Sequence, residues 1–275
     1  VETSSDGVVT SDHPVLPGSF AGLADDILAS PMLHHPPFAD EVERWVGLWS
    51  EAYSDWMPSY LGRMHGFQVI VDTTLASRGL PPSLRYLPVI ESGYNPTAVS
   101  TAKAVGLWQF MAPTAKDFGI EVGPLVDDRR DPFVSTAAAA AYLEQLNQKY
   151  DSWFLALAAY NAGPDRIDGI LRKYLPDVEP SDAAYWALRE VLPSETAAFV
   201  PNFIGAAIVA SDPVAHGYDA PVPVDFDFDR VPIRGSISFD AAARAAGTTR
   251  DEIERLNPQY VKGVTPPDRE VDLRL

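Results

Sequence analysis

The stretch Glu91-Ser92-Gly93-Tyr94-Asn95-Pro96 puts an acidic residue at the end of an otherwise apolar helical turn. Leu84 and Leu87 precede Glu91 at helical spacing, so the carboxylate shares a stripe with side chains that favour burial. Burial disfavours the charged form of a carboxyl group and raises its pKa toward neutrality, which suits a general acid. The ordinary alternative is a glutamate at a helix end that points into water.

Two further patches follow Glu91 along the chain. The first is Gly106-Leu107-Trp108-Gln109-Phe110-Met111, with Ser100 shortly before it, and the second is Ala158-Ala159-Tyr160-Asn161-Ala162-Gly163. Each patch alone is a weak motif, but three patches in this order and at this spacing are a specific signal. Together they resemble the lytic transglycosylases, which are lysozyme-like enzymes of glycoside hydrolase family 23.

The sequence around these patches resembles the D branch of the membrane-bound lytic transglycosylases. The flanking matches are Leu87-Pro88-Val89-Ile90, Arg129-Arg130-Asp131 and Pro193-Ser194-Glu195-Thr196. The resemblance covers residues 40 to 212, and it implies a mainly α fold with a helical catalytic domain like that of goose-type lysozyme.

The resemblance also implies a role for each matching residue. Glu91 matches the family's single catalytic acid/base, and Tyr160 matches a tyrosine whose hydroxyl lies near it. The residues that match sugar-contacting positions around the scissile bond are Ser100, Gln109, Met111 and Asn161. Amides and hydroxyls bind sugar hydroxyls and acetamido groups without adding a charge that would keep the glutamate ionised. Taken singly, each of these residues also has an ordinary interpretation as a turn, surface or core residue.

The function implied by the resemblance is non-hydrolytic cleavage of the β-1,4 bond between N-acetylmuramic acid and N-acetylglucosamine, which leaves 1,6-anhydro ends. Glycan strands of peptidoglycan are the expected partner. No cofactor is expected, and no metal site either, because the histidines show no ligand spacing with Asp or Glu.

Two alternatives remain open from the sequence. A goose-type lysozyme would share the fold and the glutamate but would release a hydrolysed sugar. Its second carboxylate would come from Asp117, Asp127, Asp128, Asp131, Asp165 or Asp168. A non-catalytic cell-wall binding or scaffolding protein would keep the cleft without the chemistry.

The composition of the chain limits the classes of molecule that it can bind. The chain has 275 residues, a formal net charge of −17 and no cysteine. A negative charge of this size argues against nucleic acid or anionic lipid as a partner, because phosphate binding depends on Lys and Arg. The missing cysteines exclude disulfides, thiol nucleophiles and Cys-based metal sites. We expect a monomer.

The location is inferred from what the chain lacks. No segment has the uncharged apolar length that spans a bilayer, and the first residues lack the basic start and apolar core of a signal peptide. The chain therefore resembles a mature or trimmed form. We expect a periplasmic protein, attached to the outer membrane if a removed segment upstream of residue 1 carried a lipid.

Composition divides the chain into four predicted segments. They are an extended linker or arm (1–37), a catalytic domain with N-terminal helices (38–212), a linker with a strand (213–235) and a small module (236–275).

Helical signals are strong in the predicted catalytic domain. Asp40 and Glu43 indicate a helix start, and Trp45 and Trp49 follow at helical spacing. An aromatic stripe at this spacing is more often core than a platform on which sugars stack. The residues from 153 to 160 predict a buried central helix, which ends at a Gly-Pro pair.

The last segment predicts a small α+β unit. Two short helices, 239–246 and 250–256, are followed by a closing strand at 271–273, and an alternating stretch at 225–228 predicts an edge strand before them. The segment resembles a degenerate LysM module, a small glycan-binding fold. The usual first strand with its Gly-Asp-Thr turn is missing from residues 234–238, so glycan binding and simple packing against the catalytic domain are both open.

Overall fold

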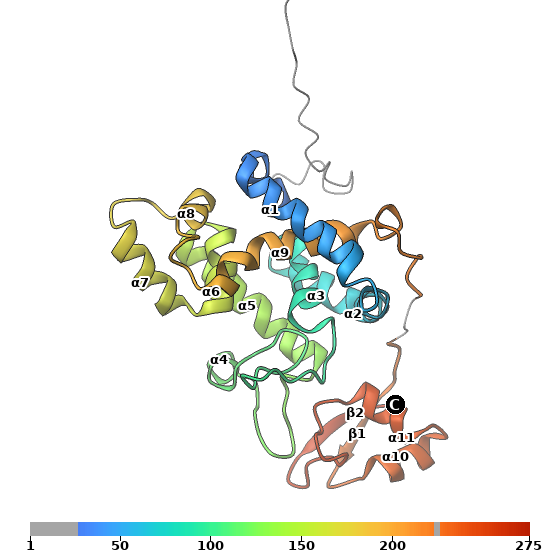
Figure 1. The fold of residues 1–275 in the computed structure, drawn as a ribbon. Helices are drawn as coiled ribbons and strands as arrows, with labels where there is room; N and C mark the ends of the chain where they lie inside the picture. The colour runs from blue at the N-terminus through green and yellow to red at the C-terminus, as the bar shows by residue number, and fades with distance from the viewer. Residues whose placement is uncertain (1–26, 223–225) are drawn as a thin grey trace, which may run out of the picture.

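The computed structural model of the protein describes residues 27–222 and 226–275. Figure 1 shows a body of helices with a small α+β unit at one end of it. The helices of the body are α1 (Pro36–Gly47), α2 (Met57–Ser77), α3 (Leu87–Ser92), α4 (Ala112–Asp117), α5 (Pro132–Tyr150), α6 (Trp153–Ala162), α7 (Pro164–Tyr174), α8 (Asp182–Ala187) and α9 (Ser194–Ser211). They are joined by the 3-10 turns η2 (Ile27–Ala29), η3 (Pro31–His34), η5 (Pro82–Tyr86) and η6 (Val214–His216), and by the π-helical turn η4 (Leu48–Ala52).

Helix α6 is the centre of the body because its sequence is apolar on every side. Its residues Phe154 to Ala159 are all buried, and it packs against α5, α7, α8 and α9. The Ser152 hydroxyl caps its first turn, and Gly163 ends it at a φ of 88°. The predicted central helix is confirmed. Its last turn carries Tyr160 and Asn161.

Helix α3 is short and carries Glu91 in its last turn. It packs against α2, η5 and α9, and it lies among the other helices of the body (Figure 1). Gly93 ends the helix in the left-handed region, at a φ of 56°. A Cβ atom at this position would lie 2.4 Å from the ring of Tyr60 on α2, so the turn and the close contact both require glycine. Glu91 is therefore fixed where α3 meets α2.

Helices α1 and α9 pack at close range on the other side of α3. A Cβ atom at Gly205 of α9 would lie 2.7 Å from the Cβ of Trp45 on α1. The buried face of α1 includes Phe38 and Val42. These helices belong to one apolar core, whose buried residues run from Ile27 to Tyr218.

The first helix and the residues before it differ from the prediction. Residues 1–26 lie outside the described part of the chain, so only the end of the predicted arm can be compared. That end is not extended, because Ile27 and Leu28 are buried in the main core. Helix α1 begins at Pro36 rather than at Asp40, since two prolines occupy its first turn, where no N–H is needed.

The C-terminal unit (residues 226–275) contains β1 (Arg230–Arg234), α10 (Phe239–Ala246), α11 (Arg250–Leu256) and β2 (Glu270–Arg274). The two strands are antiparallel, with Arg230 opposite Arg274. The side chains of Ser238 and Thr249 cap the starts of α10 and α11. The two predicted helices and the predicted closing strand are confirmed.

The first strand of this unit was predicted too early in the chain. Asp225 lies outside the described residues, and residues 226–229 are not in a strand. Strand β1 instead lies later in the segment 213–235, which was predicted to hold a linker with a strand. The physical reason is that Phe226 and Phe228 pack on Phe133 of α5, so these aromatic residues join the body rather than a sheet.

Candidate active site

Glu91 lines a cavity of about 470 Å³ whose wall is rich in aromatic rings. The aromatic residues that line it are Trp45, Trp49, Tyr53, Trp56 and Tyr60. They come from α1, η4, α2 and the turn between them, so the N-terminal helices form one wall of the site. Trp49 is buried, as predicted for a core residue, and its indole N–H donates a 2.8 Å hydrogen bond to Asn202. The exposed ring of Trp56 was not predicted as part of the site.

Burial, together with the smaller effect of the negative charge of Glu195, raises the pKa of Glu91 to about 8. Glu91 as a whole residue is half-buried, and it lines the cavity. Glu91 is thus protonated at neutral pH and accessible to a ligand. A carboxyl group in this state can donate a proton to a leaving oxygen and take one back later.

Tyr160 connects α6 to the turn that carries Gln109. The Tyr160 hydroxyl donates a 2.6 Å hydrogen bond to the carbonyl of Trp108. Burial raises the pKa of Tyr160 well above its usual value, and the nearby charge of Glu91 adds to this rise. Ser92, next to Glu91, donates a 2.8 Å hydrogen bond to the carbonyl of Leu107. The turn is therefore held at two successive carbonyls, that of Leu107 by a residue of α3 and that of Trp108 by a residue of α6.

The turn belongs to the motif loop (residues 98–111), which has an unusual backbone. Gly106 has a φ of 87°, and a Cβ atom there would lie 1.9 Å from the carbonyl oxygen of Arg129. Gln109 has a φ of 49°, which is uncommon for a residue with a side chain. Its amide donates a 2.9 Å hydrogen bond to the Gly106 carbonyl. The loop thus holds Gln109 in a fixed and strained position beside the anchored carbonyls.

Asn161 is held by two residues at the start of α9. The Thr196 hydroxyl donates to the Asn161 amide oxygen at 2.7 Å, and the amide nitrogen donates to the Glu195 carboxylate at 3.2 Å. Glu195 also acts on Glu91 through its charge. Glu195 was not predicted as a site residue, although the stretch around it contributed to the family resemblance.

Residues 69–174 match the family described as Transglycosylase SLT domain. The chain carries an SLT lytic transglycosylase domain. Residues 227–275 match the family described as the LysM-like domain of the lytic transglycosylase MltD. The predicted mainly α fold with a small α+β LysM-like unit is therefore confirmed, and an SLT domain is the match expected for the lysozyme-like part.

Among curated proteins, the membrane-bound lytic murein transglycosylase D of Escherichia coli K12 is 30% identical over 190 residues, which cover 68% of this chain and 41% of that protein. A putative tributyltin chloride resistance protein of an Alteromonas strain is 37% identical over 113 residues, or 41% of this chain and 54% of that protein. The chain thus spans well under two thirds of the relatives it matches. Among solved structures, the soluble lytic transglycosylase SLT70 of Escherichia coli is 26% identical, with a TM-score of 0.44, over 51% of this chain and 23% of that chain.

Ser100 and Met111 stand at the two ends of the motif loop of the SLT domain. The Ser100 hydroxyl accepts a 3.0 Å hydrogen bond from the Ala104 N–H, and so it shapes the loop. Met111 precedes α4 and exposes 43% of its surface. The structure brings Glu91, Tyr160, Asn161 and the turn of Gln109 near one another. The sugar contacts of Ser100, Gln109, Met111 and Asn161 stay predictions.

Several aspartates considered as a second carboxylate have other partners in the structure. Asp127 pairs with Arg129 at 2.8 Å, Asp168 pairs with Lys149 at 2.6 Å, and Asp131 pairs with Arg274. Within the described residues, no group of three or more His, Asp or Glu is placed to hold a metal ion. No described helix combines the length and the apolar character that crossing a bilayer requires.

A larger cavity, of about 800 Å³, lies away from this site. It is lined by residues such as Ser30, Arg78 and Asp182, and it contains none of the predicted site residues. The smaller cavity is the candidate active site, because Glu91 lies in its lining, whereas the other predicted site residues are not among the residues that line it.

Proposed function

We propose that this protein is a peptidoglycan lytic transglycosylase that cleaves the β-1,4 bond between N-acetylmuramic acid and N-acetylglucosamine without water. The observation that carries the proposal is Glu91, a carboxyl group of the SLT domain with a pKa of about 8 that lines a cavity with an aromatic wall. The printed name of the Escherichia coli relative, a lytic murein transglycosylase, agrees with this substrate.

In the first step, protonated Glu91 gives its proton to the glycosidic oxygen as the bond to the anomeric carbon breaks. Positive charge then develops at that carbon. Because substrate-assisted glycosidases use the sugar's own acetamido group in place of a second carboxylate, the 2-acetamido oxygen of the muramic acid stabilises this charge. The protein need supply only one catalytic carboxyl group.

In the second step, the ionised Glu91 takes the proton of the muramoyl 6-hydroxyl. The oxygen of that hydroxyl attacks the anomeric carbon and closes the 1,6-anhydro ring. Glu91 ends in its original protonated state, so the cycle consumes no water and releases no net proton. The high pKa suits both steps, because the group is an acid at neutral pH and becomes a strong base once ionised.

The remaining site residues bind and orient the sugar in this proposal. Tyr160 lies near Glu91 and holds the motif loop. The hydrogen bonds with Glu195 and Thr196 fix the orientation of the Asn161 amide. Gln109 supplies an amide from the anchored turn. Ser100 and Met111 would contact the sugar from the ends of the motif loop.

The cellular setting is part of the same proposal. Glycan strands of peptidoglycan are the partner, and the enzyme acts in the periplasm as a monomer, held at the outer membrane where a lipid-bearing segment precedes it. We keep the proposed division into a catalytic part (38–212) and a LysM-like part, with the second part beginning before residue 236 because β1 belongs to it.

The decisive experiment is mass analysis of the products from purified peptidoglycan. We expect muropeptides with 1,6-anhydro ends, each lighter by one water than the hydrolysed product, and no such product from Glu91→Gln. Reducing ends of normal mass would instead identify a goose-type lysozyme. Tight binding to sacculi with no product over long incubation would point to a scaffold protein.

A further inference from the structure

The C-terminal unit packs on residues 121–131 of the SLT domain, the docking segment, which lies between α4 and α5 (Figure 1). The Asp127 N–H donates a 2.9 Å hydrogen bond to the Gln259 carbonyl, and the Val261 N–H donates a 3.1 Å hydrogen bond to the Leu125 carbonyl. Between them, Val126 is buried in the apolar core of the C-terminal unit. The docking segment therefore completes a core that otherwise belongs to that unit.

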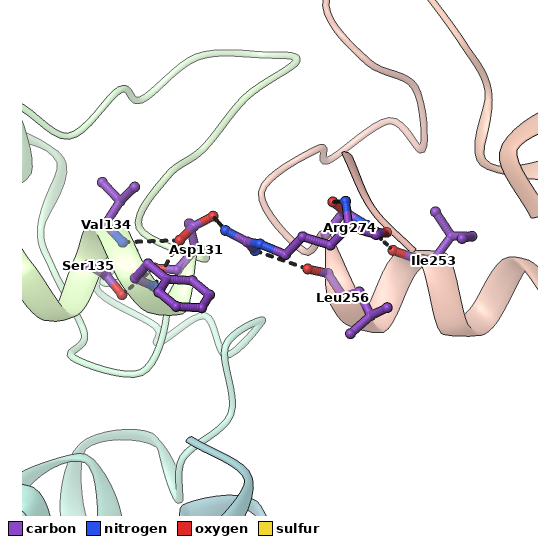
Figure 2. Close-up of polar contacts among 8 residues, drawn as sticks. Asp131, Val134, Ser135, Ile253, Leu256 and Arg274 are labelled. Atoms are coloured by element: carbon purple, nitrogen blue, oxygen red, sulfur yellow. Dashed lines mark hydrogen bonds and ion pairs between the residues drawn. The ribbon is translucent and has the colours of Figure 1, made fainter. Parts of the chain in front are cut away.

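A buried ion pair fixes the same contact. Arg274 of β2 bonds to Asp131 at the end of the docking segment (Figure 2), and the two side chains are 5% and 4% exposed. The Arg274 guanidinium also donates a 3.0 Å hydrogen bond to the Leu256 carbonyl. The second oxygen of Asp131 caps the start of α5 by accepting from the N–H groups of Phe133 and Val134. Removing either charge would leave its partner buried and unpaired, which is strongly unfavourable.

The docking segment also holds the motif loop. Arg129 is buried, and its Nη1 atom donates to the carbonyls of Lys103 and Phe110, at 3.2 and 3.1 Å. Its Nε and Nη2 atoms donate to the Asp127 carboxylate at 2.9 and 2.8 Å. Asp127 thus bonds the C-terminal unit with its N–H and bonds Arg129 with its carboxylate. Gly106 of the motif loop packs directly on the Arg129 carbonyl.

These contacts form a continuous chain from the C-terminal unit to the loop of Gln109. Gln259 holds Asp127, Asp127 holds Arg129, and Arg129 holds two carbonyls of the motif loop. The loop contains residues in left-handed conformations, which persist only where the surrounding structure enforces them. A rigid support from outside the loop is therefore required, and packed contacts of this kind can transmit it.

We propose that the C-terminal unit positions the motif loop for substrate binding through the docking segment, and that Arg274 is a positioning residue of the enzyme. The proposal rests on the proposed function, because binding the glycan is the task given to this loop. The LysM-like unit would then shape the catalytic site from outside, and this role does not require the unit itself to bind glycan.

The test uses Arg274→Met in the full chain, which removes the guanidinium group and keeps most of the stem. The steady-state constants are measured on long glycan strands and on a tetrasaccharide of two N-acetylglucosamine–N-acetylmuramic acid repeats. We expect KM to rise about tenfold on both substrates, since small misplacements of binding groups reduce activity by such factors. Amide hydrogen exchange should become faster in residues 98–111 and 121–131, while α6 keeps its protection.

Three further variants make the result specific. Arg250→Met is the control, because it removes an exposed ion pair of the same unit, between Arg250 and Asp240 at 2.6 Å. We expect neither KM nor hydrogen exchange to change in this variant. Asp131→Asn keeps the cap of α5, because asparagine also caps helices, but it loses the ion pair and should behave like Arg274→Met. The double variant should be no worse than either single one. Arg274→Lys keeps the positive charge, so its KM should lie between that of the unmodified protein and that of Arg274→Met.

Each other outcome has a defined meaning. If Arg274→Met and Arg250→Met give the same KM and the same exchange pattern, the proposal is wrong. Faster exchange throughout α6 would show a general stabilising role and would also overturn it. A KM increase confined to long strands would show that the unit binds glycan itself. If the unmodified protein forms no product, the proposed function fails, while the exchange of residues 98–111 still decides whether the unit holds the loop.

Discussion

The Tyr160 hydroxyl bonds to the carbonyl of Trp108 at 2.6 Å and so joins the last turn of α6 to the turn that presents Gln109. The tyrosine lies close enough to Glu91 for the charge of an ionised Glu91 to raise the pKa of the tyrosine. One side chain therefore lies near the acid and also holds the turn of the motif loop that carries Gln109. A purely chemical role for this tyrosine would not require the contact with the loop.

Tyr160→Phe should loosen the turn that carries Gln109. Without the hydrogen bond to Trp108, the turn loses one of its two anchors, and we expect kcat/KM to fall about tenfold and the free energy of unfolding to fall by about 1 kcal/mol. Tyr174→Phe, on the exposed end of α7, is the matched control and should change neither quantity. Unchanged kcat/KM in the Tyr160 variant would mean that Ser92 alone holds the turn.

Glu195→Gln should shift the pH dependence of activity. The Glu195 charge raises the pKa of Glu91, so removing this charge lowers that pKa from its value of about 8. The protonated form of Glu91 is the active acid, so the alkaline fall of kcat/KM should move to lower pH. Glutamine still accepts the hydrogen bond of Asn161, which leaves the geometry in place.

Glu190→Gln is the control for this pH shift, because it removes an equal charge from an exposed position in the same stretch of chain. Its alkaline limb should match that of the unmodified protein. A Glu195 variant whose profile moves to higher pH, or does not move, would contradict the electrostatic role that we assign to Glu195.

Glu91→Gln should abolish activity and stabilise the fold at high pH. The folded protein keeps a proton on Glu91 up to about pH 8, whereas the unfolded chain releases it near its ordinary value of 4.5. Stability therefore falls as pH rises through this window, and glutamine removes the fall. Allowing for the fact that the residue as a whole is only half-buried, we expect a gain of about 2 kcal/mol at pH 8 and none at pH 4. Urea unfolding at the two pH values measures the difference, and an equal effect at both would refute the high pKa.

Gly106→Ala should destabilise the motif loop. The new Cβ atom would meet the Arg129 carbonyl oxygen at 1.9 Å, at a φ that alanine rarely adopts. We expect a loss of about 3 kcal/mol in the free energy of unfolding and a large rise in KM. Gly169→Ala is the matched control, since this glycine lies within α7 with open space around its Cα. There alanine should stabilise the protein by about 0.5–1 kcal/mol. A benign Gly106 variant would contradict the close contact with Arg129.

The elements that could be predicted from the sequence are those with local signals. The buried helix α6 was predicted from its uniform apolar character and its Gly-Pro end, and α10 and α11 from the short helical stretches either side of Gly247. The start of α1 was predicted wrongly, because prolines favour both extended chain and the first turn of a helix.

The parts of the site that could not be predicted depend on contacts between distant segments. Asn161 and Glu195 are separated by 34 residues, and Asp131 and Arg274 by 143 residues. No periodicity or cap signal encodes such a pair, because each partner is an ordinary charged or polar residue in its own stretch. The burial and raised pKa of Glu91 could be predicted, since an acidic residue among apolar neighbours is itself a local signal, and its role as the catalytic acid stays a prediction.

The region that matches the SLT family is smaller than the region that supports its chemistry. Residues 69–174 leave out the aromatic wall supplied by α1 and η4, the carboxylate of Glu195 and the arginine that grips Asp131. A chimaeric protein designed to test the proposed catalytic function should therefore have its boundaries outside residues 27 and 274. A graft trimmed to the family boundaries would carry the acid without its surroundings.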